Sequence, residues 1–335
     1  MRIKNYTNFN DLPDSITSKV DELPIFVQPV YARLLFETKG WLTSWYLGYD
    51  SKGACFLLPM AVHKTKFYTK GICLFSTIYL DNTLPKDQEQ VFLDSFIAYI
   101  EEYKICDWIQ QGMNWAFFNT VPNKASFCDF GTFRVDLKSE NLGIRRDQKR
   151  EIRKAIQNGC ELVFGIKCLK DAHSVIRDTL SNASLTTYSY EYLQKLTEIL
   201  KDKILIGVVY LKQQPQAAVI AYQSNHSIYA IYAGSIYKSF PGSTPWIYQE
   251  MYETGIANGV LYFDFVGAVK NPEPESKLYR IQQFKRHMGG KEIWGYLWRY
   301  VINKRKYFIY TTILKLYCKC KHKKYGDIIY RETGK

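Results

Sequence analysis

The sequence lacks any apolar run of the roughly 18–20 residues that a membrane-spanning helix needs. Residues 1–8 are polar and run into Asp11 and Asp14 without an apolar segment, so no secretory signal is expected there. The eight cysteines are scattered singly apart from Cys318 and Cys320, which is not a disulfide framework for 335 residues. These absences predict a protein of a reducing compartment, located in the cytoplasm or at the inner face of the membrane.

Glycine and proline are scarce, at 20 and 11 residues, and hydrophobic residues make up 47% of the chain. Collagen-like, low-complexity and disordered classes are therefore excluded. Aromatic residues are abundant instead, with 27 Tyr, 19 Phe and 7 Trp. Such rings favour β-sheets and stacking pockets, and the length of 335 residues predicts about two domains.

Several signatures of common enzymes are also missing. Gly290-Lys291 is followed by Glu292, so there is no phosphate-binding P-loop, and there is no Gly-x-Ser-x-Gly elbow. The five histidines give no catalytic triad. Cys318-x-Cys320-x-His322 has the wrong spacing for a zinc clip and no second ligand pair follows it, so no metal site is expected.

Basic residues outnumber acidic ones, 45 to 32, and the excess is concentrated at the C-terminal end. Residues 301–335 contain ten Lys or Arg but only Asp327 and Glu332. A basic surface indicates an anionic partner, which can be nucleic acid, a phosphorylated sugar or nucleotide, or an acidic membrane face. Charge alone does not choose among these partners.

Two parts of the chain have the same order of predicted elements. Residues 204–211, 217–222 and 228–232 are β-rich runs with hairpin spacing, followed by a helix that begins at Thr244-Pro245 and a strand at 261–265. About 160 residues upstream, a hairpin at 41–62, a helix near 86–100 and a strand at 106–110 follow the same order. This repetition predicts a duplicated fold, although hairpin, helix and strand can also follow one another by chance.

A basic helix is predicted between the two parts. A strand at 133–137 precedes it, and the helix begins at Ser139 or Asn141 and ends near Gly159. The predicted organisation is a first domain at 1–138, a bridging helix at 139–159, a second domain at 160–300 and a basic aromatic tail at 301–335. Three arginines share one face of this helix and can bind phosphates of a nucleotide-linked substrate or tRNA, or can simply be solvated: Arg146, Arg150 and Arg153.

Four stretches together resemble the FemAB-type branch of the GNAT acyltransferase superfamily, which includes BioF2-like acetyltransferases. They are residues 24–29 (PIFVQP), 150–155 (REIRKA) followed by Gly159, 262–267 (YFDFVG) and 284–290 (FKRHMGG). The resemblance implies an α+β fold with two tandem GNAT-like domains, each a mixed, mostly antiparallel sheet flanked by helices. It also implies transfer of an acyl or aminoacyl group to an amine of a cell-envelope or surface-polysaccharide precursor, the amine acceptor being phosphorylated or nucleotide-linked.

The donor is left open between acyl-CoA and aminoacyl-tRNA. The acetyl-CoA signature of ordinary GNAT enzymes, Gln/Arg-x-x-Gly-x-Gly/Ala, is absent from residues 234–245. The long coiled-coil arm of some Fem enzymes is absent as well, because no stretch has sustained heptads. The alternative to an enzyme is a non-catalytic or nucleic-acid-binding protein that keeps the fold.

The loop before the helix at 244 is the predicted donor-binding site. A helix N-terminus there would direct free backbone N–H groups at a phosphate. The alternative is an ordinary turn between strand and helix. The candidate residues are Gly234, Lys238, Gly242, Ser243 and Thr244.

The catalytic candidates lie downstream of that loop. Alternation on the strand 261–265 puts Tyr262 and Asp264 on one face, where Asp264 can act as a general base and Tyr262 or Tyr232 can protonate a leaving group. Asp264 can equally cap a neighbouring loop. Lys285 resembles the Lys of the family's Phe-Lys motif and can stabilise developing charge, unless it is merely solvated.

The tail contains a helical aromatic segment, residues 307–318, between clusters of basic residues. Twelve helical residues span about 18 Å, which is too short to cross a membrane. Such a helix can lie in the interface of an anionic membrane through residues 301–324, or it can pack on the second domain.

Overall fold

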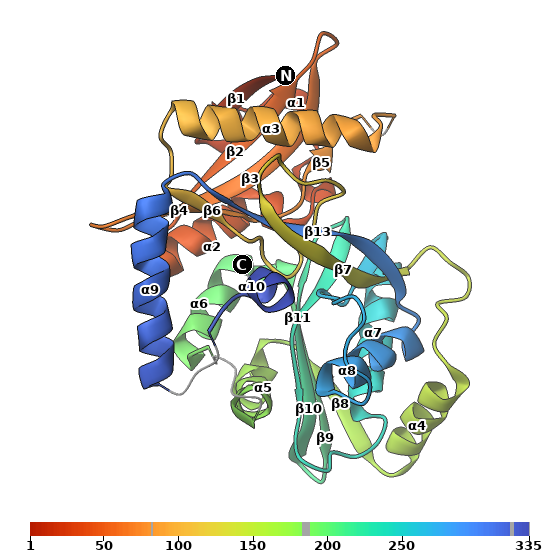
Figure 1. The fold of residues 1–335 in the computed structure, drawn as a ribbon. Coiled ribbons are helices and arrows are strands. Elements are labelled where there is room, and N and C mark those ends of the chain that lie inside the picture. Colours follow the sequence, from red (N-terminus) through yellow and green to blue (C-terminus); the bar gives the residue numbers. More distant parts are fainter. Residues whose placement is uncertain (82, 183–187, 322–324, 335) are drawn as a thin grey trace. The chain divides into compact units, whose positions relative to one another are not determined.

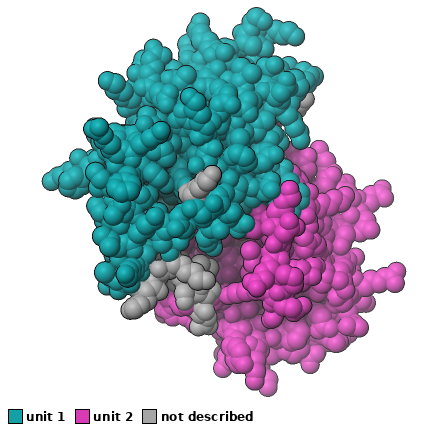
Figure 2. All heavy atoms as spheres, viewed as in Figure 1, with its two compact units in different colours: residues 1–18, 35–131, 294–335 teal, residues 19–34, 132–293 magenta. Residues whose placement is uncertain are grey.

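The computed structural model describes residues 1–81, 83–182, 188–321 and 325–334, and its fold is α+β (Figure 1). The chain forms two compact units, which Figure 2 colours separately. Unit 1 comprises residues 1–18, 35–131 and 294–335, and unit 2 comprises residues 19–34 and 132–293. The boundaries fall within helix α2 (Pro29–Lys39) and strands β7 (Ser126–Asp136) and β13 (Lys291–Val301).

The elements of unit 1, besides its parts of α2, β7 and β13, are β1 (Arg2–Tyr6), α1 (Asp14–Thr17), β2 (Leu42–Tyr49), β3 (Ala54–Lys64), β4 (Thr69–Cys73), β5 (Ile78–Tyr79), α3 (Lys86–Glu102), β6 (Trp108–Gln110), α9 (Lys304–Cys320) and α10 (Ile328–Thr333). Those of unit 2 are α4 (Arg146–Gln157), β8 (Cys160–Phe164), α5 (Leu169–Asn182), α6 (Tyr190–Leu200), β9 (Ile204–Leu211), β10 (Gln214–Gln223), β11 (Ser227–Ser235), α7 (Ser243–Ala257), β12 (Tyr262–Asp264) and α8 (Lys277–His287). Short 3₁₀ turns lie at Phe9–Asp11, Val20–Glu22, Ile25–Val27, Ile166–Cys168 and Lys201–Lys203.

The two units share one strand topology. Strands β1, β2, β3 and β4 pair antiparallel in that order, and β4 then pairs in parallel with β6 after the crossover helix α3. Strands β8, β9, β10 and β11 likewise pair antiparallel, and β11 pairs in parallel with β12 after α7. In each unit the last strand of this series has a further antiparallel neighbour, β13 for β6 and β7 for β12. The predicted tandem, mostly antiparallel architecture is confirmed.

Burial explains the long apolar runs. Residues 217–222 of β10 are buried throughout because helix α5 packs on one face of the unit 2 sheet and α7 on the other (Figure 1). In unit 1, the apolar face of α3 packs on β2 and β3, where the rings of Phe56 and Phe92 stack at 5.2 Å. Helical spacing of apolar residues predicted α3 correctly for this reason.

Some boundaries differ from those expected. Helix α4 begins at Arg146 and not at Ser139 or Asn141. Asn141 instead forms a turn, in which its side-chain oxygen accepts a hydrogen bond from the N–H of Gly143, a residue with φ +73°. The motif at residues 24–29 lies between β1 and β2 in the sequence but belongs to unit 2, where Phe26 contacts Tyr229.

The tail packs in unit 1. Tyr310 of α9 contacts Trp108 and Tyr68 at ring distances of 4.9 and 5.1 Å. The two compact units do not coincide with the expected domain ranges. Residues 19–34 belong to unit 2, and residues 301–335 belong to unit 1. No described helix is long and apolar enough to cross a membrane.

Candidate functional site

The site in unit 2 begins where β11 and β12 part. Their parallel pairing covers Ser227–Tyr229 against Tyr262–Asp264, and β11 continues to Ser235. A bulge interrupts the pairing of β11 with β10, because Ile220 opposes Tyr232 and Ala221 opposes Ala230. Ile231 is thus an extra residue that bends β11. After β11 ends at Ser235, the loop 236–242 leads to α7.

A cavity of about 330 Å³ lies at the start of α7. It is lined by Gln148, Ser239, Phe240, Pro241, Gly242, Thr244, Pro245 and Phe284. The predicted donor-site residues Gly242 and Thr244 therefore line a cavity. Ser243 is buried, and its hydroxyl donates a hydrogen bond to the carbonyl oxygen of Phe240.

The start of α7 differs from the expected cap. Gly242, with φ +89°, stands at the N-cap in place of Ser243 or Thr244. A Cβ atom on Gly242 would lie on the backbone of Glu151, with its carbonyl carbon only 2.5 Å away. Glycine at this position allows α4 to approach the start of α7 closely.

Few N–H groups of this loop are available to an anion. The N–H of Phe240 donates to the side chain of Gln216, that of Ser243 to the carbonyl of Phe240, and that of Ser239 to Ile236. Residues 241 and 245 are prolines and carry no N–H group. Trp246 makes the first helical hydrogen bond of α7, to the carbonyl of Gly242. Before it, between described residues 239 and 245, only the N–H groups of Gly242 and Thr244 make no hydrogen bond within the protein. The helix N-terminus therefore offers an anion two backbone donors at these positions.

The other predicted phosphate ligands lie elsewhere. Gly234 is buried beneath α5, where a Cβ atom would lie 2.9 Å from Ile176 Cα. Lys238 is exposed, and its ammonium lies 5.5 Å from the ring centre of Tyr237. Gly234 and Lys238 are not among the residues that line the cavity at α7.

The three arginines of α4 are exposed. At 100° per residue they lie on the side of the helix opposite the buried Ile152 and the cavity-lining Gln148. Arg150 forms an ion pair with Glu151 at 3.6 Å, and Arg153 donates to the carbonyl of Lys149. Arg146, Arg150 and Arg153 thus form a basic outer face of α4 and do not reach the cavity at α7.

Lys285 lies on α8, next to the cavity-lining Phe284. Its ammonium donates hydrogen bonds of 2.6 Å to the carbonyl oxygens of Val266 and Gly267. Burial lowers the pKa of Lys285 to about 8, and the carboxylate of Asp264 opposes that shift. The predicted alternative of a solvated lysine is wrong for this side chain.

The turn that holds Lys285 has an unusual backbone. Val266 has φ +43° and Gly267 has φ +68°. A positive φ is rare for a β-branched residue and costs of order 1–3 kcal/mol. The carbonyls of these two consecutive left-handed residues both accept hydrogen bonds from the same ammonium.

Asp264 is buried, with 2% of its surface exposed. One carboxylate oxygen accepts hydrogen bonds from the Thr132 hydroxyl and from the N–H of Val266, at 2.9 Å for the latter. The other forms an ion pair of 3.1 Å with Arg134. These contacts match the alternative in which Asp264 holds a loop, and the general-base role stays a prediction.

Tyr262 shares the face of Asp264, as the alternation predicted. The guanidinium carbon of Arg134 lies 5.3 Å from the ring centre of Tyr262 and the same group pairs with Asp264. The ring of His226 lies 5.6 Å from that of Tyr262 in a tilted arrangement, and burial lowers the pKa of His226 to about 4. His226 is therefore neutral at physiological pH.

Tyr232 belongs to a different group of side chains. Its ring lies 5.0 Å from that of Tyr188 and 6.4 Å from that of Tyr222. Burial raises the pKa of Tyr232 well above its usual value. The structure thus brings together Tyr262, Asp264 and Lys285 but places Tyr232 in a tyrosine cluster.

Sequence reasoning missed Thr132 and Arg134, whose partners lie about 130 residues away in the chain. The alternation of side chains along the predicted strand 133–137 could assign Arg134 to one face of the sheet, but it could not identify Asp264 as its partner. The described residues contain no group of three His, Cys, Asp or Glu side chains placed to hold a metal ion. His322, part of the Cys-x-Cys-x-His pattern, lies outside them.

Comparison with known proteins gives one family match and several structural neighbours. Residues 144–286 match the family described as acetyltransferase (GNAT) domain. That range contains α4, the cavity at α7, Asp264 and Lys285. No curated protein matches the sequence.

Solved structures share the fold at low sequence identity. A structure of FemX is 12% identical with a TM-score of 0.66, and the match covers 91% of this chain and 99% of that one. A tandem GNAT protein from the clavulanic acid biosynthesis pathway is 6% identical with a TM-score of 0.53, covering 90% and 99%. The C-terminal domain of a candidate lysylphosphatidylglycerol synthetase from Agrobacterium fabrum is 11% identical with a TM-score of 0.52, covering 89% and 98%.

Proposed function

We propose that this chain, whose residues 144–286 match the GNAT acetyltransferase domain family and whose fold resembles that of FemX, transfers an aminoacyl group from aminoacyl-tRNA to an amine. The acceptor is a phosphorylated or nucleotide-linked precursor of the cell envelope or of a surface polysaccharide. The observation that carries the proposal is the Lys285 ammonium, which donates hydrogen bonds to the carbonyls of Val266 and Gly267. The preceding residue on α8, Phe284, lines the cavity at the start of α7.

The start of α7 supports tRNA over acyl-CoA as the donor. A CoA pyrophosphate needs several converging N–H donors, whereas two prolines and three internal hydrogen bonds leave residues 239–245 with two uncommitted N–H groups. The basic outer face of α4 and the net charge of +13 suit a large polyanion instead. Among the neighbours, the Agrobacterium protein is named a lysylphosphatidylglycerol synthetase.

For aminolysis of the donor ester, the protein has to position the two substrates and stabilise the developing negative charge. The acceptor nitrogen attacks the ester carbonyl carbon of the donor, the C–N bond forms, and the C–O bond to the tRNA ribose breaks. An ammonium has three N–H donors, and Lys285 gives two of them to Val266 and Gly267. The third donates to the oxyanion of the intermediate, and its proton then passes to the leaving oxygen. The neutral Lys285 amine takes up the proton that the attacking nitrogen loses, which restores the ammonium.

Asp264 contributes indirectly, by holding the turn that binds Lys285. It accepts the N–H of Val266 and so fixes the turn whose carbonyls hold Lys285. Its negative charge also favours the protonated form of Lys285. We assign Asp264 a positioning role, with Tyr262 and Arg134 supporting it from the same face.

The test supplies both donors in parallel. Purified protein is incubated with aminoacyl-tRNA or acetyl-CoA, each radiolabelled in the acyl group, together with nucleotide-linked amino sugars. We expect label to pass from tRNA to the acceptor with wild-type protein and with the exposed-lysine control Lys277→Ala, and not with Lys285→Ala. Transfer from acetyl-CoA alone would overturn the donor assignment, and hydrolysis without transfer would overturn the acceptor class.

A further inference from the structure

Helix α9 of unit 1 exposes a continuous apolar face. Six of its side chains recur at positions i, i+1, i+4, i+5, i+8 and i+9, which places them along one stripe of the helix. Five of them are large hydrophobic side chains that are 52–70% exposed. The stripe comprises Phe308, Ile309, Thr312, Ile313, Leu316 and Tyr317.

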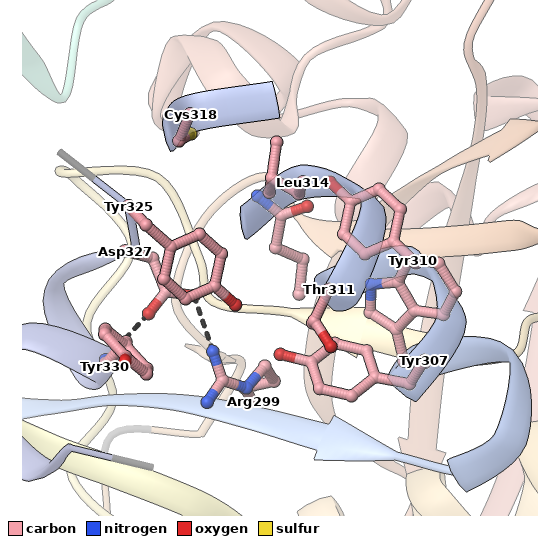
Figure 3. Close-up of a pocket in the computed structure, with 12 residues that line it drawn as sticks. Arg299, Tyr307, Tyr310, Thr311, Leu314, Cys318, Tyr325, Asp327 and Tyr330 are labelled. Carbon is pink, nitrogen blue, oxygen red and sulfur yellow. Dashed lines mark hydrogen bonds and ion pairs between the residues drawn. The ribbon is translucent and has the colours of Figure 1, made fainter. Parts of the chain in front are cut away.

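The opposite face of α9 is anchored to unit 1. Tyr307 and Tyr310 pack on Trp108 at ring distances of 5.4 and 4.9 Å. Figure 3 shows both tyrosines in a cavity that also contains Arg299, whose guanidinium pairs with Asp327 at 2.7 Å. One face of α9 therefore packs on unit 1, and the apolar stripe on its other face is exposed to solvent.

A neighbouring turn extends the apolar surface. Phe67, at the turn between β3 and β4, is 81% exposed. Together with Ile309, Ile313 and Tyr317 it lines an apolar groove of about 720 Å³. An isolated exposed phenylalanine is ordinary, but a ring that continues an apolar helix face marks an interaction surface.

Basic residues accompany this surface on the helix and in the turn. Residues 304–321 contain no Asp or Glu, and the turn adds Lys64 and Lys66. Lys306 pairs with Asp107, and the ammonium of Lys315 lies over the rings of Tyr325 and Tyr330. The basic residues of the helix are Lys304, Arg305, Lys306, Lys315, Lys319 and Lys321.

We propose that α9 and the Phe67 turn form a docking surface for an anionic membrane. Seventeen helical residues span about 25 Å, so α9 lies in the plane of the interface, with its stripe among the acyl chains and its basic flanks on the lipid phosphates. This inference rests on the surface of unit 1 and does not depend on the transferase site. Residues 322–324, part of the predicted membrane segment, lie outside the described residues.

Charge complementarity selects this occupant over others. A second copy of the chain would bring one acid-free basic helix against another, which is repulsive. Nucleic acid would satisfy the lysines but would leave five large apolar side chains in water. An anionic bilayer satisfies both features together.

The experiment is flotation of the full chain with phosphatidylcholine vesicles, with and without about 30% phosphatidylglycerol. We expect flotation with the anionic vesicles at low salt and its loss at high salt. Ile309→Asn/Ile313→Asn should weaken binding about tenfold or more, and Lys304→Gln/Arg305→Gln by a similar factor. All four positions are exposed, so these variants should fold like the wild type.

Matched controls change the same residue types elsewhere. Ile156→Asn/Ile256→Asn replaces exposed isoleucines of α4 and α7, and Lys167→Gln/Lys170→Gln removes two exposed charges near α5. Both should bind anionic vesicles like the wild type. The proposal is overturned if the wild type ignores anionic vesicles at low salt, or if the α9 variants bind as well as the controls. Self-association that is lost only in the isoleucine variant, without vesicle binding, would assign the surface to a second copy instead.

Discussion

Lys285 Nζ lies 2.6 Å from the carbonyl oxygen of Val266, a β-branched residue with a positive φ of 43°. The hydrogen bond from the N–H of Val266 to Asp264 holds this conformation from the other side. A strained turn thus links a buried carboxylate to a partly buried ammonium.

Replacing Lys285 tests whether this ammonium takes part in the reaction. We expect Lys285→Ala to lower turnover about 10²-fold or more, because one preorganised donor to a developing oxyanion contributes that much. Lys277→Ala, on the same helix and exposed, should retain activity. Turnover is measured at saturating donor, and equal rates for the two variants would contradict the role of Lys285.

The pH dependence of transfer should report the same group. Burial lowers the pKa of Lys285 to about 8, so the donating ammonium predominates below pH 8 and is lost above it. The acceptor amine must be deprotonated, which gives a rising limb at lower pH. We expect a bell-shaped profile that falls above pH 8, and the falling limb should be absent in Lys285→Arg. A wild-type rate that keeps rising through pH 10 would show that no ammonium of this kind is required.

Asp264→Asn should affect both stability and the pH profile. The side chain of Asp264 is 3% exposed and that of Arg134 is 21% exposed. Neutralising one partner of such a pair should lower the free energy of unfolding by about 2–3 kcal/mol. The loss of negative charge should also shift the falling limb of the pH profile to lower pH, because Asp264 raises the pKa of Lys285.

A double-mutant cycle separates the pair from its surroundings. Arg134→Gln alone and Arg134→Gln/Asp264→Asn are unfolded in urea beside the single Asp264 variant. We expect the double variant to lose less stability than the sum of the single variants. An unmoved falling limb in Asp264→Asn would argue against its electrostatic effect on Lys285, whatever the change in stability.

Much of the fold was predictable because local patterns agree with the packing. The meander at 204–235, helix α3 and helix α7 follow from hairpin spacing, apolar periodicity and the Thr244-Pro245 start. The start of α4 was not predictable in this way. Ser139 and Asn141 are good cap residues, but Asn141 uses its side chain in a turn and the helix begins only at Arg146.

The site was predictable only in part. The Phe284-Lys285 pair and Asp264 could be found from short motifs. The partners of Asp264 could not, because Thr132 and Arg134 reach it through pairing of β7 with β12, which joins strands distant in the sequence. The loop before α7 could be located from the sequence, but the internal hydrogen bonds that its N–H groups make at Ser239, Phe240 and Ser243 could not be predicted.

Gly242→Ala should disturb the start of α7. The backbone has φ +89° there, and the added Cβ would clash with the carbonyl of Glu151. We expect the free energy of unfolding to fall by about 2 kcal/mol or more, together with weaker donor binding. Gly259→Ala is the matched control, because Gly259 has φ +71° but open space around it. If both variants lose the same stability in urea, the close packing of α4 on α7 contributes nothing.

The outer face of α4 offers a way to distinguish the donors. Arg146→Gln/Arg150→Gln/Arg153→Gln removes three exposed charges that lie away from the cavity at α7, so the fold and the reacting groups should be unaffected. If tRNA is the donor, removing each arginine that binds a phosphate should reduce the slope of log affinity against log salt by about one. Filter binding of aminoacyl-tRNA at several salt concentrations measures that slope, with Lys167→Gln/Lys170→Gln as a charge control. An unchanged slope together with unchanged transfer would mean that the arginine face is only a solvated surface, and that a polyanionic donor approaches the site from another direction.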